Sequence, residues 1–132
     1  MDTGPLVALL NRPDNAHAWV LQQMGDIQPP LITCEAVLAE ATYLTRQVPG
    51  ARAALIEMVG EGFLTIGMAV ADHHSALLAM VRRYANVPMS LADGCLVRLA
   101  ELNPQSPVMT LDRDFTVYCK NGRQVIELLC PW

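Results

Sequence analysis

The sequence predicts an α/β fold with a central, mostly parallel sheet flanked by helices. Short apolar, β-compatible runs alternate with longer segments of helical periodicity, and the first three runs cover residues 29–32, 63–66 and 107–111. Strands and helices alternate in this way when a crossover follows each strand, which makes neighbouring strands parallel and covers both faces of the sheet. A length of 132 residues suits one domain with one core.

Helices are predicted from apolar periodicity and from the residues that start and stop them. Pro5 suits the first position of a short apolar helix, and Pro49-Gly50 separates two later helices. Asn121-Gly122 predicts a turn ahead of a last strand at residues 125–129. The predicted helices cover residues 6–10, 15–24, 34–46, 51–59, 72–84 and 90–100.

The composition narrows the class of protein. Hydrophobic residues make up 52% of the chain and charged residues only 17%, so some apolar surface is expected to serve a partner. No apolar run is long enough to span a membrane, and no signal peptide is expected. The four cysteines lack the spacing of a zinc site and fit reduced thiols in the cytoplasm. A net charge of −4 is unusual for a protein that binds nucleic acid.

Asp93 lies in the first turn of the last predicted helix, where two roles compete. Ser90 and Asp93 have the spacing of a capping box, in which the carboxylate only stabilises the start of the helix. Yet Asp93 shares one helical face with Leu96, Val97 and Ala100, and that apolar face should point inward. The local pattern supports a cap and a site about equally.

Asp112 and Asp114 follow a short buried strand. In open α/β sheets ligands gather beyond the carboxyl ends of strands, where Asp112 is expected to lie. The plainer interpretation is that Asp112 is a turn residue and that Arg113 and Asp114 form a weak surface pair.

Asp2 and Glu40 are ambiguous by themselves. Asp2 has the pattern of a charged chain end, and Glu40 that of a mid-helix surface residue on the edge of an apolar face. If both converge with Asp93 and Asp112, the cluster of carboxylates needs a cation.

Four motifs occur in register along the chain: Asp-Thr at 2–3, Val-Leu-Ala-Glu at 37–40, Ser-Leu-Ala-Asp at 90–93 and Thr-Leu-Asp-Arg-Asp-Phe at 110–115. In this order and spacing they resemble the PIN domain over essentially the whole chain, and most of all the small prokaryotic ribonucleases of the VapC toxin type. The resemblance implies a three-layer PIN-like fold. It also implies a catalytic and metal-binding set, which comprises Asp2, Glu40, Asp93 and Asp112, with Asp114 as a further metal ligand and Thr3 and Thr110 as polar neighbours.

The resemblance further implies a metal-dependent endoribonuclease that hydrolyses phosphodiester bonds of RNA with Mg²⁺ or Mn²⁺. It implies a homodimer and a cognate antitoxin protein as partner. Bound cations would offset part of the negative charge, and RNA phosphates could then meet arginines, for which the candidates are Arg46, Arg82, Arg83, Arg98 and Arg113.

The chain departs from the family pattern at its start. Family members carry several apolar residues before the first Asp, which form the central strand, whereas here Met1 directly precedes Asp2. We therefore expect one PIN-like domain over residues 1–132 with its first strand truncated before Asp2.

Two other functions are weighed against the nuclease. A catalytically weak PIN-fold module that keeps its protein partner is favoured by the short first strand, but not by four acidic positions. A phosphatase-like α/β hydrolase would need Asp-x-Asp at the first strand end, and Asp2-Thr3-Gly4 does not supply it.

Overall fold

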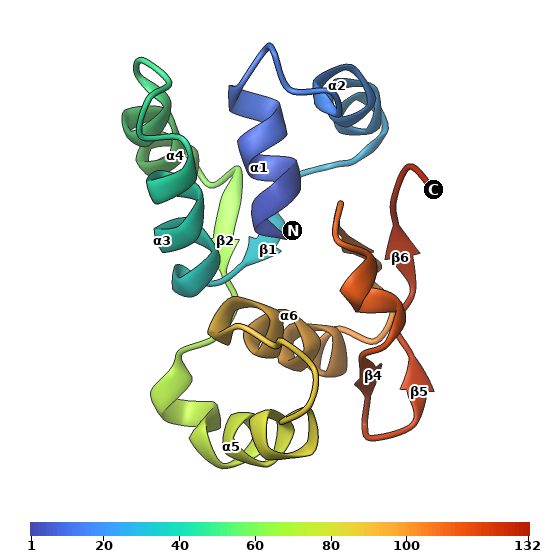
Figure 1. The fold of residues 1–132 in the computed structure, drawn as a ribbon. Coiled ribbons are helices and arrows are strands. Elements are labelled where there is room, and N and C mark those ends of the chain that lie inside the picture. The colour runs from blue at the N-terminus through green and yellow to red at the C-terminus, as the bar shows by residue number, and fades with distance from the viewer.

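The computed structural model describes all 132 residues as six α-helices around short strands (Figure 1). In this view α1 and α2 lie above β1, and α6 and α5 lie below it. The helices are α1 (Thr3–Leu10), α2 (His17–Asp26), α3 (Glu35–Leu44), α4 (Ala51–Gly60), α5 (His74–Arg83) and α6 (Leu91–Leu102). The strands are β1 (Leu31–Thr33), β2 (Leu64–Ile66), β3 (Val108–Met109), β4 (Cys119–Lys120), β5 (Gln124–Val125) and β6 (Leu128–Leu129), and the 3₁₀ helices are η1 (Val70–His73) and η2 (Arg113–Thr116).

The strands form three separate pairs. β1 pairs with β2 and β3 pairs with β6, both in parallel, while β4 and β5 form an antiparallel hairpin. Asn121 and Gly122 connect the hairpin with positive φ angles of 50° and 79°, as Asn-Gly does in tight hairpin turns. The predicted α/β class with parallel pairing is confirmed.

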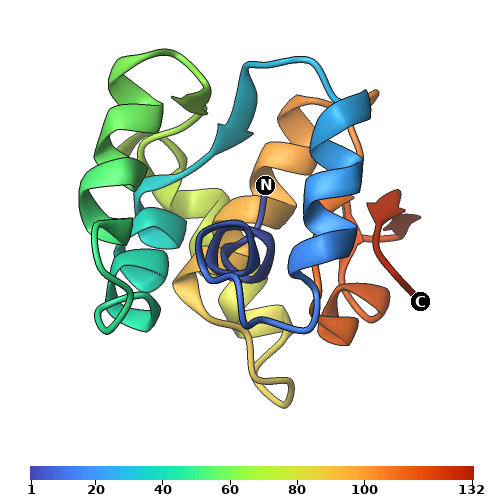
Figure 2. The ribbon, with the colours of Figure 1, turned by 90° about the horizontal axis from the view of Figure 1, so that it is seen from above.

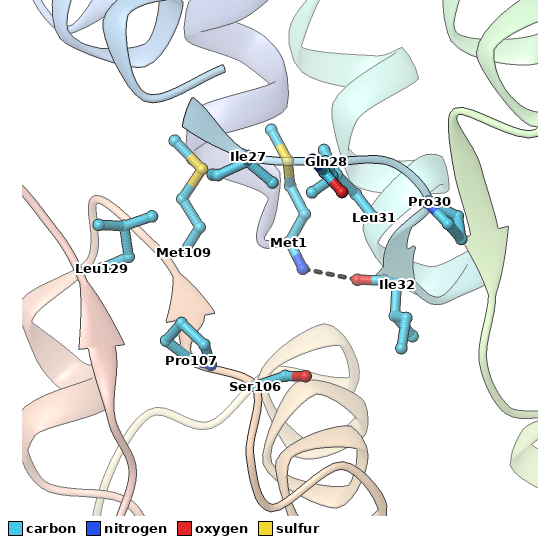
Figure 3. Close-up of a pocket in the computed structure, with 10 residues that line it drawn as sticks. All are labelled: Met1, Ile27, Gln28, Pro30, Leu31, Ile32, Ser106, Pro107, Met109 and Leu129. Carbon is cyan, nitrogen blue, oxygen red and sulfur yellow. Dashed lines mark hydrogen bonds between the residues drawn. The ribbon is translucent and has the colours of Figure 1, made fainter. Parts of the chain in front are cut away.

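The amino end of the chain lies between the two parallel pairs, as Figure 3 shows. The Met1 amine donates to the Ile32 carbonyl in β1 at 2.6 Å, and the Asp2 N–H donates to the Met109 carbonyl in β3 at 3.0 Å. Residues 1–2 therefore bridge β1 and β3 as the end of a central strand would. Ahead of Met1 the space is a cavity of about 280 Å³ between the two edges.

Helix α6 is the centre of the core. Most of its residues are buried, and it packs on α3, α5, β1 and β4. On the other side α1 packs on α2 and α3, and Figure 2 shows α1 end-on between the α3–α4 pair and α2. No helix is both long and apolar enough to cross a bilayer.

The helix boundaries agree with the sequence pattern within a few residues, with informative exceptions. Helix α1 begins at Thr3 rather than at Pro5, because Asp2 is its N-cap and accepts a bond from the Thr3 N–H. The strand predicted at 125–129 is divided between β5 and β6, since Ile126 and Glu127 turn the chain from the hairpin to β3.

Candidate active site

The four predicted carboxylates line one open cavity of about 500 Å³. Each comes from a different segment of the chain: Asp2 caps α1, Glu40 lies in α3, Asp93 in the first turn of α6, and Asp112 after β3. Asp114, the fifth predicted residue, does not line this cavity. The other lining residues are Thr3, Gly4, Leu44, Ser90 and Leu111.

Asp2 is the most rigidly held of the four. Its side chain is buried, with 6% of the residue exposed, and it accepts from the Thr3 N–H and from the Thr110 hydroxyl, both at 2.6 Å. Burial raises the pKa of Asp2 above its ordinary value, Asp93 raises it further, and the two hydrogen bonds partly oppose this shift. Asp2 is therefore a preorganised carboxylate whose charge is not fully compensated.

Thr110 links Asp2 to Asp112. It is fully buried, donates its hydroxyl to Asp2, and accepts from the Asp112 N–H at 2.9 Å. Asp112 itself is exposed and accepts from the Asp114 N–H at 2.9 Å, so it caps η2. The turn role that the sequence offered for Asp112 is real, and it coexists with a place at the cavity.

Asp93 caps its helix and also lines the cavity. Ser90 and Asp93 form a reciprocal capping box, in which the Asp93 carboxylate accepts from the Ser90 N–H at 2.8 Å and the Ser90 hydroxyl accepts from the Asp93 N–H at 3.0 Å. The same half-buried side chain lines the cavity. One carboxylate oxygen serves the cap, which leaves the other for a ligand.

Glu40 is exposed in the second half of α3 and accepts from the Thr3 hydroxyl at 2.9 Å. Thr3, which the sequence suggested only as a neighbour, thus joins Glu40 to the residue after Asp2. Thr3 and Glu40 are 37 positions apart, so no local sequence pattern could have predicted this hydrogen bond.

The charge of the cavity is one-sided, because none of its lining residues is Lys, Arg or His. The buried Tyr118 responds to the same field: burial raises its pKa, and Asp93, Asp114 and Asp112 raise it further. No three acidic side chains yet converge closely enough to hold one ion. The oxygen-only donor set nevertheless fits a hard divalent cation, provided that the exposed Glu40 and Asp112 rotate toward the fixed Asp2.

We expect Thr110→Val to weaken the fold by about 1.5–3 kcal/mol at neutral pH, because the buried Asp2 carboxylate loses a charge-assisted hydrogen bond. The pKa of Asp2 should rise further, so the loss should be smaller in acid, where Asp2 is neutral in both proteins. Urea unfolding at several pH values measures it. Thr33→Val is the matched control, since the equally buried Thr33 hydroxyl donates to the neutral Met1 carbonyl; equal, pH-independent losses in both variants would contradict the assignment.

Comparison with known proteins places the chain in a family. The sequence model described as "PIN domain" matches residues 1–121, which is most of the chain. No match to the chain was found among curated proteins. PIN domains are generally metal-dependent nucleases and typically use divalent ions, which agrees with four carboxylates around one cavity. The chain belongs to the PIN domain family.

Proposed function

We propose that the protein is a metal-dependent endoribonuclease that hydrolyses phosphodiester bonds of RNA. The observation that carries the proposal is the convergence of Asp2, Glu40, Asp93 and Asp112 on one cavity without a basic residue. Capping explains Asp2, Asp93 and Asp112 one by one, but it does not explain why all four carboxylates share one cavity, since like charges in one place cost stability. A bound cation attracts all four carboxylates, so their clustering then stabilises the protein.

The roles of the residues follow from their hydrogen bonds and their exposure. Asp2 and Asp93 are fixed by hydrogen bonds and would orient Mg²⁺ or Mn²⁺, while the exposed Glu40 and Asp112 complete the set. Asp114, whose N–H donates to Asp112, is a further metal ligand. When bound, the ion activates water for attack on phosphorus and stabilises the developing charge. Thr110 favours the ionised form of Asp2 by donating to it, and Thr3 donates to Glu40.

The direct test is cleavage of RNA by the purified protein, free of any bound partner, with Mg²⁺, Mn²⁺ or EDTA. We expect cleavage with either metal and none with EDTA. A catalytically weak binding module is the alternative, and it is favoured by the fact that no three acidic side chains converge in this structure. RNA cleavage that is equal with and without EDTA, or absent with every metal, would contradict the nuclease.

We further propose that this nuclease is a cytoplasmic toxin held by a cognate antitoxin, and that it forms a homodimer. The support is apolar surface on one pair of helices. A groove of about 350 Å³ between α3 and α4 is lined by Leu38, Leu55, Ile56 and Val59, and Ile56 is 69% exposed. Such a groove suits the apolar face of a partner helix. The apolar residues of α1 are a weaker candidate, because Leu6 and Ala8 are fully buried.

Sedimentation at tens of micromolar tests the self-association. A homodimer should give twice the mass of the 132-residue chain, and a charged side chain in Ile56→Glu should weaken the groove contact. A strictly monomeric protein would contradict the dimer but not the nuclease.

A further inference from the structure

Aromatic side chains are few in this protein, and only two of them are exposed. Tyr84, Phe115 and Tyr118 form a buried cluster of edge-to-face rings. In contrast, Tyr43 is 64% exposed and Trp132 is 39% exposed. A single exposed ring needs no explanation by itself, so its surroundings decide whether it marks a contact surface.

The two exposed rings share a pattern, since each carries an arginine. The Arg46 guanidinium carbon lies 4.3 Å from the centroid of the Tyr43 ring, and that of Arg113 lies 5.2 Å from the Trp132 ring. Neither arginine has a carboxylate partner, because the protein's one ion pair joins Arg98 to Glu101. Arg46 also donates to the Tyr43 carbonyl at 2.9 Å, which holds its guanidinium beside the ring without neutralising its charge.

Each pair contains a residue next in sequence to one that lines the carboxylate cavity, although none of the four residues lines it. Tyr43 follows Glu40 by three positions in α3, so the two side chains share a helix face, and the next residue, Leu44, lines the cavity. On the other side Arg113 directly follows Asp112, which also lines it. The remaining predicted arginines are engaged elsewhere or lie on α5: Arg98 bonds Glu101, and Arg83 donates to the Gly122 carbonyl.

We infer that the Tyr43–Arg46 and Arg113–Trp132 pairs bind the nucleotides on either side of the bond that is cleaved. The inference rests on the proposed nuclease and names how it grips its substrate. A cavity lined by four carboxylates repels phosphates until a cation is bound, so affinity for the strand must come from outside it. Exposed rings stack on bases and the neighbouring guanidinium groups meet phosphates.

The two pairs can engage only unpaired bases. A ring can stack on a base only when the face of the base is free, which it is in single strands and loops but not inside a duplex. Stacking on one ring strengthens binding by roughly 5- to 150-fold, so loss of either ring should be measurable.

Binding of a fluorescent single-stranded RNA of about twelve nucleotides tests the inference, measured by anisotropy in EDTA, in which the proposed nuclease does not cleave. Tyr43→Leu and Trp132→Leu should each weaken binding within that range, whereas Tyr43→Phe and Trp132→Phe should keep most of it. Arg46→Gln and Arg113→Gln should weaken binding and lower its salt dependence. Arg123→Gln, in the β4–β5 hairpin, is the matched control and should change neither by more than about twofold.

The outcomes separate the inference from the proposed function. Ring-dependent binding by a protein that cleaves no RNA with any metal would remove the nuclease and keep the RNA-binding pairs. Metal-dependent cleavage with binding that ignores both rings, or that is as tight for a duplex, would overturn the inference alone. Unchanged RNA binding with lost self-association in Tyr43→Leu would assign that ring to a protein interface and would also overturn it.

Discussion

Joining about four apolar residues ahead of Met1 is expected to raise the free energy of unfolding by about 2–4 kcal/mol. The reason is the cavity between β1 and β3, where Met1 and Asp2 already make one hydrogen bond to each side. The added residues should extend this path as a parallel strand and join the two strand pairs into one sheet. For a chain of 132 residues the melting temperature should rise by roughly 6–20 °C.

The edges that face this cavity are ready for a strand. Val108 and Thr110 donate their N–H groups to the β6 side, so the alternation of a strand directs the Met109 N–H toward the cavity. In β1, Leu31 donates to Phe63 ahead of β2, which directs the Ile32 N–H toward the cavity in the same way. Neither edge has a partner strand there.

The free volume differs between the two faces of the added strand, and this difference specifies its sequence. Met1 points its side chain toward Ile27 on the face with the larger cavity of about 280 Å³ (Figure 3). On the α6 side, beside Leu96 and Leu99, only about 40 Å³ is free. Successive residues point to opposite faces, so a small residue such as Ala should directly precede Met1, with a large apolar residue before it.

The buried amine supplies a pH signature for the same experiment. Burial lowers the pKa of the Met1 amine from 8.0 to about 6. Between these values the unfolded chain holds the proton and the folded chain does not, so the stability of the 132-residue protein should rise with pH from about 6 to 8. An extension replaces the amine by a peptide bond, and this rise, on the order of 3 kcal/mol, should disappear.

Thermal melts from pH 5 to 9 compare the 132-residue protein, an apolar extension and a Gly-Ser extension of equal length. The Gly-Ser control also removes the amine but fills neither face, so it should lose the pH dependence without the full gain in stability. Equal melting temperatures for both extensions would show that no strand forms between β1 and β3.

The sequence predicted the helices and the residues of the cavity better than it predicted the strands. Helix α6 is specified locally, by the Ser90–Asp93 capping box and by an apolar face that is buried as expected. The strands are two or three residues long, and β4 was missed, although the Asn121-Gly122 turn after it was predicted, because its residues carry no apolar alternation. Their positions are set by pairing across the fold, which periodicity does not record.

The place of Asp2 shows the same limit. By pattern Asp2 is a frayed end, yet its N–H bonds to Met109 and its carboxylate to Thr110, 108 positions away. Conversely, Asp93 shows that two predictions treated as rivals can both hold, since capping uses one edge of a carboxylate and leaves the other to the cavity. Its part in binding metal stays a prediction.

Asp93→Asn is expected to lower ribonuclease activity by orders of magnitude while leaving the fold intact. The amide oxygen can still accept from the Ser90 N–H, so the capping box weakens but persists. Removal of one negative charge relieves the repulsion that helps raise the pKa of Asp2, so the melting temperature in EDTA should stay equal or rise.

The metal response decides whether Asp93 belongs to the site. In the wild type, stabilisation by Mg²⁺ or Mn²⁺ should grow as RT ln(1 + [L]/Kd), and in Asp93→Asn it should shrink or vanish. Glu35→Gln is the matched control, because Glu35 occupies the first turn of α3 but does not line the cavity. A carboxylate that only caps its helix would give a loss of about 0.5–1 kcal/mol with an unchanged metal response. Thermal melts of the three proteins across a metal titration distinguish these outcomes, and a wild-type response in Asp93→Asn would remove Asp93 from the metal site.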